Sequence, residues 1–516
     1  MYSIHRYTKT ILAIFVIISA FLGVLRFNSL QLGTSYDDAH YIILAESLSS
    51  GQGYQLINFP RPQIERAFPP GWPVLLMPWV RLFPGNYDLL KLFSLLLWLA
   101  SILLIYKLFS KRIESPQLEI VTGLAAINPL LVGTSVTVMS ESAYLFFSLL
   151  ALIVFDKWNE TANGKKDWLV VLIAVLAMYT QLIRTIGVSL VMALLVYFLL
   201  TRRFREAGIT TGVFVSGILL QTWLNLRNGG SVVSASYETQ VFNSSLLDKI
   251  GQMGSNALGY FNEILVGSLI PIFGSKVTAY LGSHGLEALP AFVNILILFL
   301  VVGGLALSGK KFHAMDIYVA IYFLGILAFW NPKVGSVKAR FLIPILPFLY
   351  FYLTRGMAWA AAKLARNRIN FGRRTEAVLV GLIALALLSR NFQDWQNPVM
   401  NQMTDLSIGA SWVAENAPPD AIVMVNEPIP AYVQVKRKTV SFPTAGQNLE
   451  SYLTNRGVEY IIVSPRLQSP RSYELDPFIA QQILPALQSA PEKFVVVFAN
   501  PENNVEVYRY IGGQQE

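Results

Sequence analysis

Cysteine is absent from this 516-residue chain, which excludes disulfide bridges, thiolate metal sites and cysteine nucleophiles. Charge is also scarce, since Asp, Glu, Lys and Arg together make up 14% of the residues, against roughly 25% in a typical soluble domain. Hydrophobic residues make up 54%, and the mean hydropathy is +0.48. These values are typical of a membrane protein whose surface is mostly covered by lipid.

Three motifs that mark common nucleotide and metal chemistry are also missing. The sequence has no P-loop, no HExxH zinc motif and no EF-hand spacing, so nothing in it supports ATP hydrolysis or zinc-dependent hydrolysis. No internal repeat stands out, whereas transporters usually contain two-fold repeats with interrupted helices.

Long apolar segments are the strongest positive signal. A membrane-spanning helix needs roughly 20 mostly apolar residues, and this criterion predicts a polytopic α-helical membrane protein with about eleven spans. The first apolar run follows Arg6 and Lys9, and no clear small-residue cleavage site comes after it, so we expect an uncleaved signal-anchor helix. The predicted spans lie near residues 10–27, 89–109, 117–135, 140–156, 168–183, 185–200, 208–225, 289–308, 314–330, 338–354 and 376–392.

The basic residues predict the orientation of these spans. With the N-terminus in the cytoplasm, every short inner segment contains Lys or Arg, such as Lys111, Arg112 and Arg203, as the positive-inside rule requires. Topology thus accounts for the net charge of +9, and we expect no nucleic-acid partner. Two outer segments are long, at about residues 28–88 and 226–288, and an odd number of spans places the C-terminus outside.

The composition changes near residue 393. "DLSIGASWVAENAPPDAIVMVNEP" predicts a helix, a Pro-Pro break and a short buried strand, and "LESYLTNRGVEYIIVSP" repeats that order, with Gly457 ending the helix. "KFVVVFAN" and "VEVYRYI" predict two closing strands around an Asn/Pro turn. We therefore expect a transmembrane domain at residues 1–393 and a small C-terminal extracytoplasmic α/β domain at residues 394–516.

A few ionisable residues lie near membrane depth, where a charge is costly and is often functional. In the predicted topology all of them fall at or near the outer ends of helices, which suggests one shared cavity with carboxylates opposite basic groups. They are Asp37, Asp38, Glu141, Arg184, Lys333, Lys338 and Arg340.

Each of these residues also has a structural interpretation. An aspartate pair after a helix is commonly a polar loop or an N-cap, Glu141 could form a buried ion pair, and arginines at helix ends extend to lipid headgroups. His40 alone is interpreted as structural, and Trp72 fits an interfacial aromatic belt. The joint pattern, more than any single residue, favours a functional site.

Carboxylates opposite arginines at the outer face of a bilayer suit one kind of chemistry. A carboxylate can take the proton of an acceptor hydroxyl or amine as general base, and a planar guanidinium binds phosphate oxygens through two hydrogen bonds. Nucleotide sugars are supplied in the cytosol, so a transferase on the outer face needs a lipid carrier. The pattern predicts group transfer from a lipid-linked phosphate donor.

The order of these motifs resembles a known family. An N-terminal helix followed by "SYDDAHYIILAESLSSGQGY" and "FPPGWPVLLMP" is similar to the first outer loop of GT-C superfamily glycosyltransferases, nearest to the bacterial protein O-mannosyltransferase and lipid A aminoarabinose transferase relatives. "SESAYLFFSLLALIVF", "LIRTIGVSL" and "ARFLIPILPFLY" follow in matching order. The resemblance covers about residues 5–395. It implies a multi-pass protein of the bacterial inner (plasma) membrane, surrounded by membrane lipids, whose transmembrane domain is catalytic.

The resemblance implies a role for each matched residue. Asp37 matches the catalytic base, Asp38 the second acid that holds the acceptor or a cation, and Glu141 an acidic residue close to the acceptor. The residues implied to bind the donor phosphate are Arg184, Lys338 and Arg340. The residues implied to line the substrate cavity are Tyr36, His40, Tyr41, Pro69, Pro70 and Trp72.

The implied reaction is one displacement with inversion at the anomeric carbon of the sugar. A polyprenyl-phosphate-linked donor gives its sugar to a glycan, lipid or protein acceptor while the arginines stabilise the departing phosphate. The alternative function is that of a multi-pass transporter or flippase for a lipid-linked or anionic substrate, in which the same charges would line the substrate path.

Two points are left open by the resemblance. Some GT-C enzymes use a divalent cation such as Mg or Mn and others none, so no cofactor is assigned, and Asp37, Asp38 and Glu141 are the residues that could supply oxygen ligands. Asp38 replaces a glutamate that is common in the family, and Phe68 stands where some relatives have the lysine of a Lys-Pro-Pro sequence. These departures argue against aminoarabinose as the transferred sugar.

Overall fold

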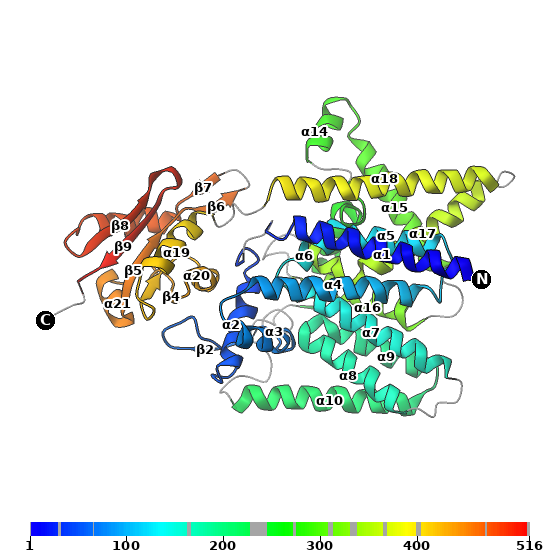
Figure 1. Ribbon diagram of the computed structural model, residues 1–516, viewed down its shortest axis with the longest axis horizontal. Coiled ribbons are helices and arrows are strands. Elements are labelled where there is room, and N and C mark those ends of the chain that lie inside the picture. Colours follow the sequence, from blue (N-terminus) through cyan, green and yellow to red (C-terminus); the bar gives the residue numbers. More distant parts are fainter. Residues whose placement is uncertain are drawn as a thin grey trace.

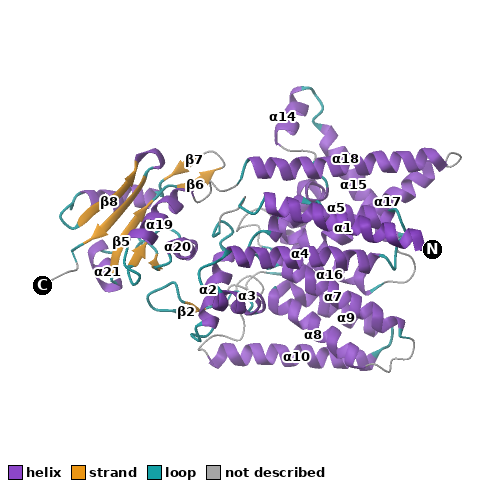
Figure 2. Ribbon diagram, viewed as in Figure 1, coloured by secondary structure: helices purple, strands orange, loops and turns teal. Residues whose placement is uncertain are grey.

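The computed structural model describes residues 2–28, 32–65, 67–161, 167–227, 245–271, 275–307, 313–330, 338–364, 369–398, 404–469 and 472–512. Figure 1 shows a bundle of helices lying side by side, with a five-stranded sheet beyond one end of it. We call that end of the bundle the sheet end, and the opposite end, where the N-terminus lies, the far end. Figure 2 shows the same division between helical and strand-rich parts.

The first half of the bundle is formed by ten helices. They are α1 (Tyr2–Leu25), α2 (Asp37–Ser49), α3 (Gly71–Leu82), α4 (Asp88–Phe109), α5 (Gln117–Ala126), α6 (Pro129–Ser135), α7 (Glu141–Glu160), α8 (Asp167–Ile183), α9 (Val188–Leu200) and α10 (Phe204–Arg227). A short 3₁₀ turn, η1 (Thr185–Gly187), joins α8 to α9. Between α2 and α3, β1 (Gln55–Leu56) pairs antiparallel with β2 (Gln63–Ile64).

The second half of the bundle contains two interrupted regions. Its helices are α12 (Leu246–Gly259), α13 (Leu265–Leu269), α14 (Ser275–Ser283), α15 (Ala288–Ala306), α16 (Ala314–Phe329), α17 (Leu346–Leu364) and α18 (Ile369–Gln396). A π-helical turn, η2 (Tyr260–Ile264), joins α12 to α13, and the 3₁₀ segment η4 (Ala339–Ile345) leads into α17. Residues 228–244 and 272–274 of the long segment predicted at 226–288 lie outside the described residues, as does Lys333.

Length and apolarity support an integral membrane protein. Within the described ranges, four helices are long and apolar enough to cross a membrane, or five if the bent pair α5–α6 is one span. The four are Asp88–Phe109, Ala288–Ala306, Ala339–Lys363 and Glu376–Gln396. Shorter apolar helices occur at Lys9–Leu25, Asp167–Ile183, Thr185–Leu200 and Ala314–Phe329. The total of eleven spans and their orientation stay predictions.

The α5–α6 bend has a local cause. Pro129 has no amide hydrogen to continue α5, and the side chain of Asn128 accepts hydrogen bonds from the amides of Leu130 and Leu131, so a new helix starts there after a 50° bend. The Asn128 amide also donates to the Tyr350 hydroxyl at 2.8 Å, which ties the bend to α17.

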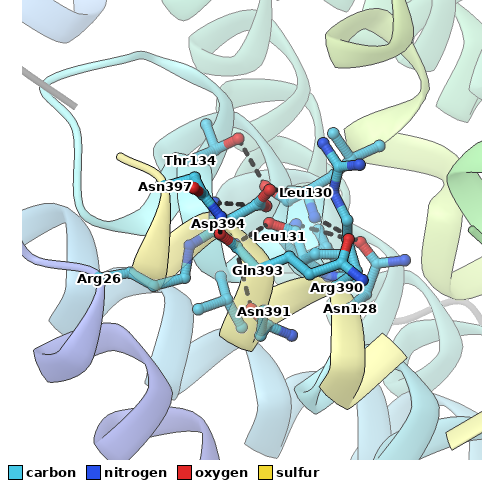
Figure 3. A network of polar contacts seen from close by, with 12 residues as sticks. Arg26, Asn128, Leu130, Leu131, Thr134, Arg390, Asn391, Gln393, Asp394 and Asn397 are labelled. Carbon is cyan, nitrogen blue, oxygen red and sulfur yellow. Dashed lines mark hydrogen bonds and ion pairs between the residues drawn. The ribbon is translucent and has the colours of Figure 1, made fainter. Parts of the chain in front are cut away.

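A buried polar network joins the end of α1 to α6 and α18 at the sheet end (Figure 3). Arg26 donates to the carbonyl of Pro129 at 2.7 Å and to the Asn391 side chain at 3.0 Å, and it pairs with Asp394 at 3.0 Å. A Cβ added to Gly133 would lie 2.7 Å from an Arg26 nitrogen, so α6 approaches closely because residue 133 is glycine. The network anchors the chain just before the segment at residues 28–88.

Two glycines allow α15 and α17 to touch along their backbones. A Cβ on Gly304 would overlap the carbonyl of Tyr352, and a Cβ on Gly356 would overlap the carbonyl of Leu300. Small residues at such contacts are typical of helix pairs in membranes. This packing supports η4, which precedes α17 and contributes to the site described below.

The five-stranded sheet has the order β4-β3-β5-β9-β8. β3 is parallel to both β4 and β5, whereas β9 is antiparallel to both β5 and β8. Its strands are β3 (Ile422–Met424), β4 (Lys438–Val440), β5 (Val458–Val463), β8 (Phe494–Asn500) and β9 (Val505–Tyr510). The two strands predicted from "KFVVVFAN" and "VEVYRYI" are therefore present as neighbours.

Helices cover both faces of this sheet. They are α19 (Thr404–Asn416), α20 (Pro428–Val435), α21 (Leu449–Arg456) and α22 (Leu484–Gln488), the last preceded by the π-helical turn η6 (Ile479–Ile483). β6 (Arg466–Ser469) and β7 (Ser472–Glu474) form a separate hairpin. α21 ends at Gly457 with φ of 65°, as the sequence predicted. The domain boundary at residue 393 stays a prediction, and α18 continues to Gln396.

Candidate active site

The ends of several helices meet at the sheet end of the bundle around one cavity of about 360 Å³. α2 contributes its first turn, the segment before α3 contributes a Phe-Pro turn, and the α8–η1 junction, the end of α16 and the start of η4 complete the wall. The lining residues are Asp37, Tyr41, Ala67, Phe68, Pro69, Arg184, Thr185, Ile186, Val188, Tyr322, Ile326, Phe329, Trp330, Arg340 and Phe341.

Asp37 and Arg340 form an ion pair inside this cavity. The Arg340 guanidinium lies 2.8 Å from the Asp37 carboxylate, and the two side chains are 35% and 22% exposed. Asp37 is the first residue of α2, where the helix dipole favours a negative charge. Arg340 stands beside the ring of Phe341 at 5.3 Å. Two residues 303 positions apart in the sequence therefore contact each other directly in the lining of the cavity.

A second ion pair lies deeper. Arg184 is 2.6 Å from Glu141, the first residue of α7, and the Glu141 side chain is fully buried. Arg184 also donates to the Ser140 hydroxyl at 3.0 Å, and this hydroxyl contacts the hydroxyl of Tyr41 at 3.1 Å. Arg184 lines the cavity whereas Glu141 does not. Glu141 therefore compensates the charge of Arg184 without facing the cavity itself.

Asp38 points away from the cavity. Its carboxylate accepts hydrogen bonds from the backbone amides of Gly33 at 2.8 Å and Ala39 at 3.0 Å, and the residue is 2% exposed. Burial raises the pKa of the Asp38 carboxyl to about 6, although the backbone donors oppose this shift. The structure thus separates the adjacent aspartates into one that faces the cavity and one that braces the loop before α2.

Tyr41, Phe68 and Pro69 form one wall, as the resemblance implied for Tyr41 and Pro69. Two hydrogen bonds fix the backbone of Phe68: its carbonyl accepts from the Tyr54 hydroxyl at 2.9 Å, and its amide donates to the Glu65 carboxylate at 3.3 Å. The ring of Phe68 meets the ring of Tyr41 edge-on at 5.3 Å.

His40 and Tyr36 lie behind this wall. The His40 ring stacks on Phe68 at 4.5 Å, and its Nδ1 lies 3.1 Å from the Tyr36 carbonyl. Burial lowers the pKa of His40, which keeps the ring neutral near pH 7. Tyr36 has φ of 61°, an unfavourable conformation for a non-glycine residue immediately before the first residue of α2.

Pro70 and Trp72 lie outside the lining. Pro70 is the N-cap of α3, and the Trp72 indole is fully buried and donates to the Val138 carbonyl at 3.0 Å. The prediction that Trp72 belongs to an interfacial belt is therefore wrong, because the ring packs inside the bundle against Phe93. The neighbouring Gly71 permits the close approach of α3 to α8, since a Cβ there would lie 2.6 Å from the Leu182 backbone.

Lys338 is exposed and lies outside the cavity lining, and its backbone carbonyl accepts from the Tyr260 hydroxyl at 3.3 Å.

The sequence did not predict the apolar wall of the cavity. It is formed by η1, α9 and the end of α16, and Tyr322 on α16 donates to the Phe341 carbonyl at 2.8 Å. These residues carry no charge and lie in apolar runs, so no sequence signal distinguished them from lipid-facing residues.

The three carboxylates suggested as cation ligands do not converge. Asp37 faces Arg340, Asp38 faces two backbone amides, and Glu141 faces Arg184. Within the part of the chain that the structure describes, no group of three or more His, Cys, Asp or Glu residues could hold a metal ion. The donor set of these three residues therefore does not fit a divalent cation.

Comparisons with known proteins rest on structure. No protein-family model matches the chain, and no curated protein matches it. ArnT from Cupriavidus metallidurans bound to undecaprenyl phosphate matches with a TM-score of 0.58 at 15% identity, over 97% of this chain and 98% of ArnT. The oligosaccharyltransferase of Archaeoglobus fulgidus in the apo form matches with a TM-score of 0.58 at 14% identity, over 88% of this chain and 69% of its own.

The same archaeal oligosaccharyltransferase, solved with an inhibitory peptide and a dolichol-phosphate, matches over 100% of this chain and 75% of its own, with a TM-score of 0.53 at 14% identity. These proteins are GT-C glycosyltransferases, and the likeness extends across the helical bundle and the sheet. The resemblance read from the motifs is thereby confirmed at the level of architecture: this chain has the GT-C fold and is similar to ArnT-like relatives.

Proposed function

We propose that the protein is a membrane glycosyltransferase that moves a sugar from a polyprenyl-phosphate donor to an acceptor, with inversion at the anomeric carbon. The observation that carries this proposal is the ion pair of Asp37 and Arg340, at 2.8 Å, in the lining of one cavity. A carboxylate that can accept a proton thus stands beside a guanidinium that can bind a phosphate.

Asp37 is the general base of the proposed reaction. The acceptor O–H or N–H gives its proton to the Asp37 carboxylate while the acceptor atom attacks the anomeric carbon. The bond between that carbon and the phosphate oxygen breaks, and its electron pair stays on the polyprenyl phosphate. One displacement from the face opposite the leaving group inverts the configuration. Asp38, to which the resemblance assigns the acceptor or a cation, accepts hydrogen bonds from the backbone amides of Gly33 and Ala39.

Arg340 and Arg184 stabilise the departing phosphate. Arg340 is 35% exposed in the cavity, and Arg184 also lines it, so both can approach the same phosphate. The apolar wall that includes Ile186, Ile326 and Phe329 suits the hydrocarbon chain next to that phosphate. In other proteins of this fold, undecaprenyl phosphate is bound to ArnT, and a dolichol-phosphate is bound to the archaeal oligosaccharyltransferase.

The reaction is proposed to take place at the outer face of a bacterial inner membrane, with the N-terminus in the cytoplasm. Basic residues at the inner ends of the predicted spans support this orientation. The sheet then lies outside the cytoplasm, on the same side as the cavity. The acceptor is a glycan, lipid or protein.

The direct test supplies purified protein with radiolabelled polyprenyl-phosphate sugars and a membrane extract. We expect release of polyprenyl phosphate together with transfer of the label to an acceptor. Arg340→Ala should lower the affinity for the donor, and Arg340→Lys should lower it too, because an ammonium cannot make the two parallel hydrogen bonds of a guanidinium.

Arg205→Ala is the matched control, because Arg205 forms an exposed ion pair with Asp167 and does not line the cavity. Its donor affinity should equal that of the wild type. Absence of transfer with every lipid donor, together with substrate flux in proteoliposomes, would instead establish the transporter alternative.

A further inference from the structure

α20 contributes to two hydrophobic cores at once. Ala431 and Val435 pack in the core beneath the five-stranded sheet, whereas Ile429 and Val433 are 6% and 3% exposed and pack in the core of the helical bundle. Residues four apart lie on one face of a helix, so the two pairs form opposite faces. α20 is therefore a rigid bridge between the sheet and the bundle, and its partner in the bundle is α2.

α20 first contacts the segment that leads into α2. The Gln434 side chain donates to the Leu32 carbonyl at 3.1 Å, and Ser407 on α19 fixes Gln434 by donating to its side-chain oxygen at 2.8 Å. A Cβ on Gly33, which has φ of 93°, would lie 3.0 Å from Pro430. Gly33 in turn donates its amide to Asp38.

α20 also contacts the other end of α2. The Glu46 carboxylate accepts from the Tyr87 hydroxyl at 2.7 Å and interacts with the hydroxyl of Tyr432 on α20. Burial raises the pKa of Glu46, and the two hydroxyl donors oppose that shift. Tyr432 and Gln434 are two residues apart, so one turn of α20 reaches both ends of a helix of 13 residues.

A backbone hydrogen bond also connects β4 to the segment between α2 and α3. The amide of Thr439 in β4 donates to the carbonyl of Asn58 at 2.7 Å, and Asn58 is fully buried. The edge of the sheet thus continues into the segment between α2 and α3. Three successive parts of the segment at residues 28–88, before, within and after α2, contact residues 428–440: Leu32 contacts Gln434, Glu46 contacts Tyr432, and Asn58 contacts Thr439.

We infer that α20 is a positioning element for the general base, with Tyr432 and Gln434 as its positioning residues. The inference rests on the proposed function of Asp37, the first residue of α2. Helix α2 moves as a unit, so a displacement at either end moves Asp37 relative to Arg340 and Arg184, which belong to other elements. Proton transfer needs the base within hydrogen-bond reach of the acceptor, and a misplacement of about 1 Å is costly.

The test compares two tyrosines in the same part of the protein. Tyr432→Phe removes the hydroxyl that reaches Glu46, whereas Tyr452→Phe removes a hydroxyl that donates at 2.8 Å to Ser441, away from α2. Each change keeps the ring and loses one hydrogen bond. Gln434→Ala removes the contact with Leu32.

We expect Tyr432→Phe and Gln434→Ala each to lower kcat by about three- to tenfold at saturating substrates, as loss of one hydrogen bond implies. The affinity for polyprenyl phosphate should stay at the wild-type value, because neither arginine lies on α2. Hydrogen exchange of the α2 amides should become faster. Tyr452→Phe should leave all three quantities unchanged.

Wild-type kcat together with wild-type exchange in α2 for Tyr432→Phe and Gln434→Ala would overturn the inference. An equal loss of kcat in Tyr452→Phe would also overturn it, because the effect would then be general destabilisation of the sheet. If the wild-type protein transfers no sugar, the proposed function fails, and the exchange experiment still decides whether α20 holds α2.

Discussion

Replacing Asp37 by Asn should abolish sugar transfer and at the same time tighten the binding of polyprenyl phosphate. Without substrate, Arg340 is engaged by the Asp37 carboxylate at 2.8 Å. A phosphate that binds Arg340 must compete with that carboxylate. Asn keeps an oxygen that can accept a hydrogen bond but has no charge, so the competition weakens.

The size of the effect follows from how exposed the pair is. The side chains of Arg340 and Asp37 are 35% and 22% exposed, so solvent screens their attraction. Exposed ion pairs contribute roughly 0.2–1 kcal/mol, and about 1.4 kcal/mol corresponds to a factor of ten. The dissociation constant of polyprenyl phosphate should therefore fall by about 1.4- to fivefold. The gain should shrink at high salt.

Equilibrium binding of polyprenyl phosphate to purified wild-type and Asp37→Asn protein measures this directly. The control adds Asp37→Asn to Arg340→Ala. Asp37→Asn should give no gain in affinity in this background, because the arginine for which Asp37 and the phosphate compete is absent. Weaker or unchanged binding by Asp37→Asn at low salt would refute the assignment of Arg340 as the phosphate contact. Normal transfer by Asp37→Asn would refute the assignment of Asp37 as the base.

Three further changes test the surroundings of the site. The pKa of Asp38 is raised to about 6 in the folded protein, against 3.8 in the unfolded chain, so Asp38 stabilises the fold below about pH 4, and about 3 kcal/mol of this stability is lost as pH rises through 6. Asp38→Asn should remove this pH dependence of the melting temperature. Equal pH dependence of the melting temperature in the wild type and Asp38→Asn would contradict the assignment. Glu141→Ala should destabilise by about 3–5 kcal/mol because Arg184 is left without its carboxylate, and additivity with Arg184→Ala in thermal unfolding would argue against coupling. Gly304→Ala should separate α15 from α17 and lower the melting temperature, whereas Gly303→Ala, where nothing lies within 4 Å, should leave it unchanged or raise it; equal effects would contradict the close packing.

The site was predicted where charge is unusual. Asp37, Glu141, Arg184 and Arg340 stand out because an ionisable residue near membrane depth is costly. The structure brings these four together in two pairs. Lys338 has the same charge and a similar place in the sequence, yet it is exposed outside the cavity lining, in extended backbone at the N-cap of η4.

Uncharged residues could not be assigned in the same way. Trp72 has the polar ring typical of an interfacial residue, but the indole is buried, and the carbonyl of Val138, in the turn between α6 and α7, accepts its hydrogen bond. Tyr322 and Phe341 line the cavity although they lie within apolar runs. Composition is the same for a side chain that faces lipid and for one that faces an apolar cavity, so only packing separates them.

The sequence by itself predicted the apolar helices, the strands that close the sheet and the ionisable residues that meet in the two ion pairs, because hydropathy, helix ends and ionisable residues are local properties. Only the tertiary structure decided which aspartate faces the cavity. Asp37 and Asp38 are neighbours, but successive residues of a helix point about 100° apart. Arg340 lies opposite the first, and the Gly33 amide opposite the second. Those partners are set by the packing of distant segments, including α20 against α2, and no local pattern encodes them.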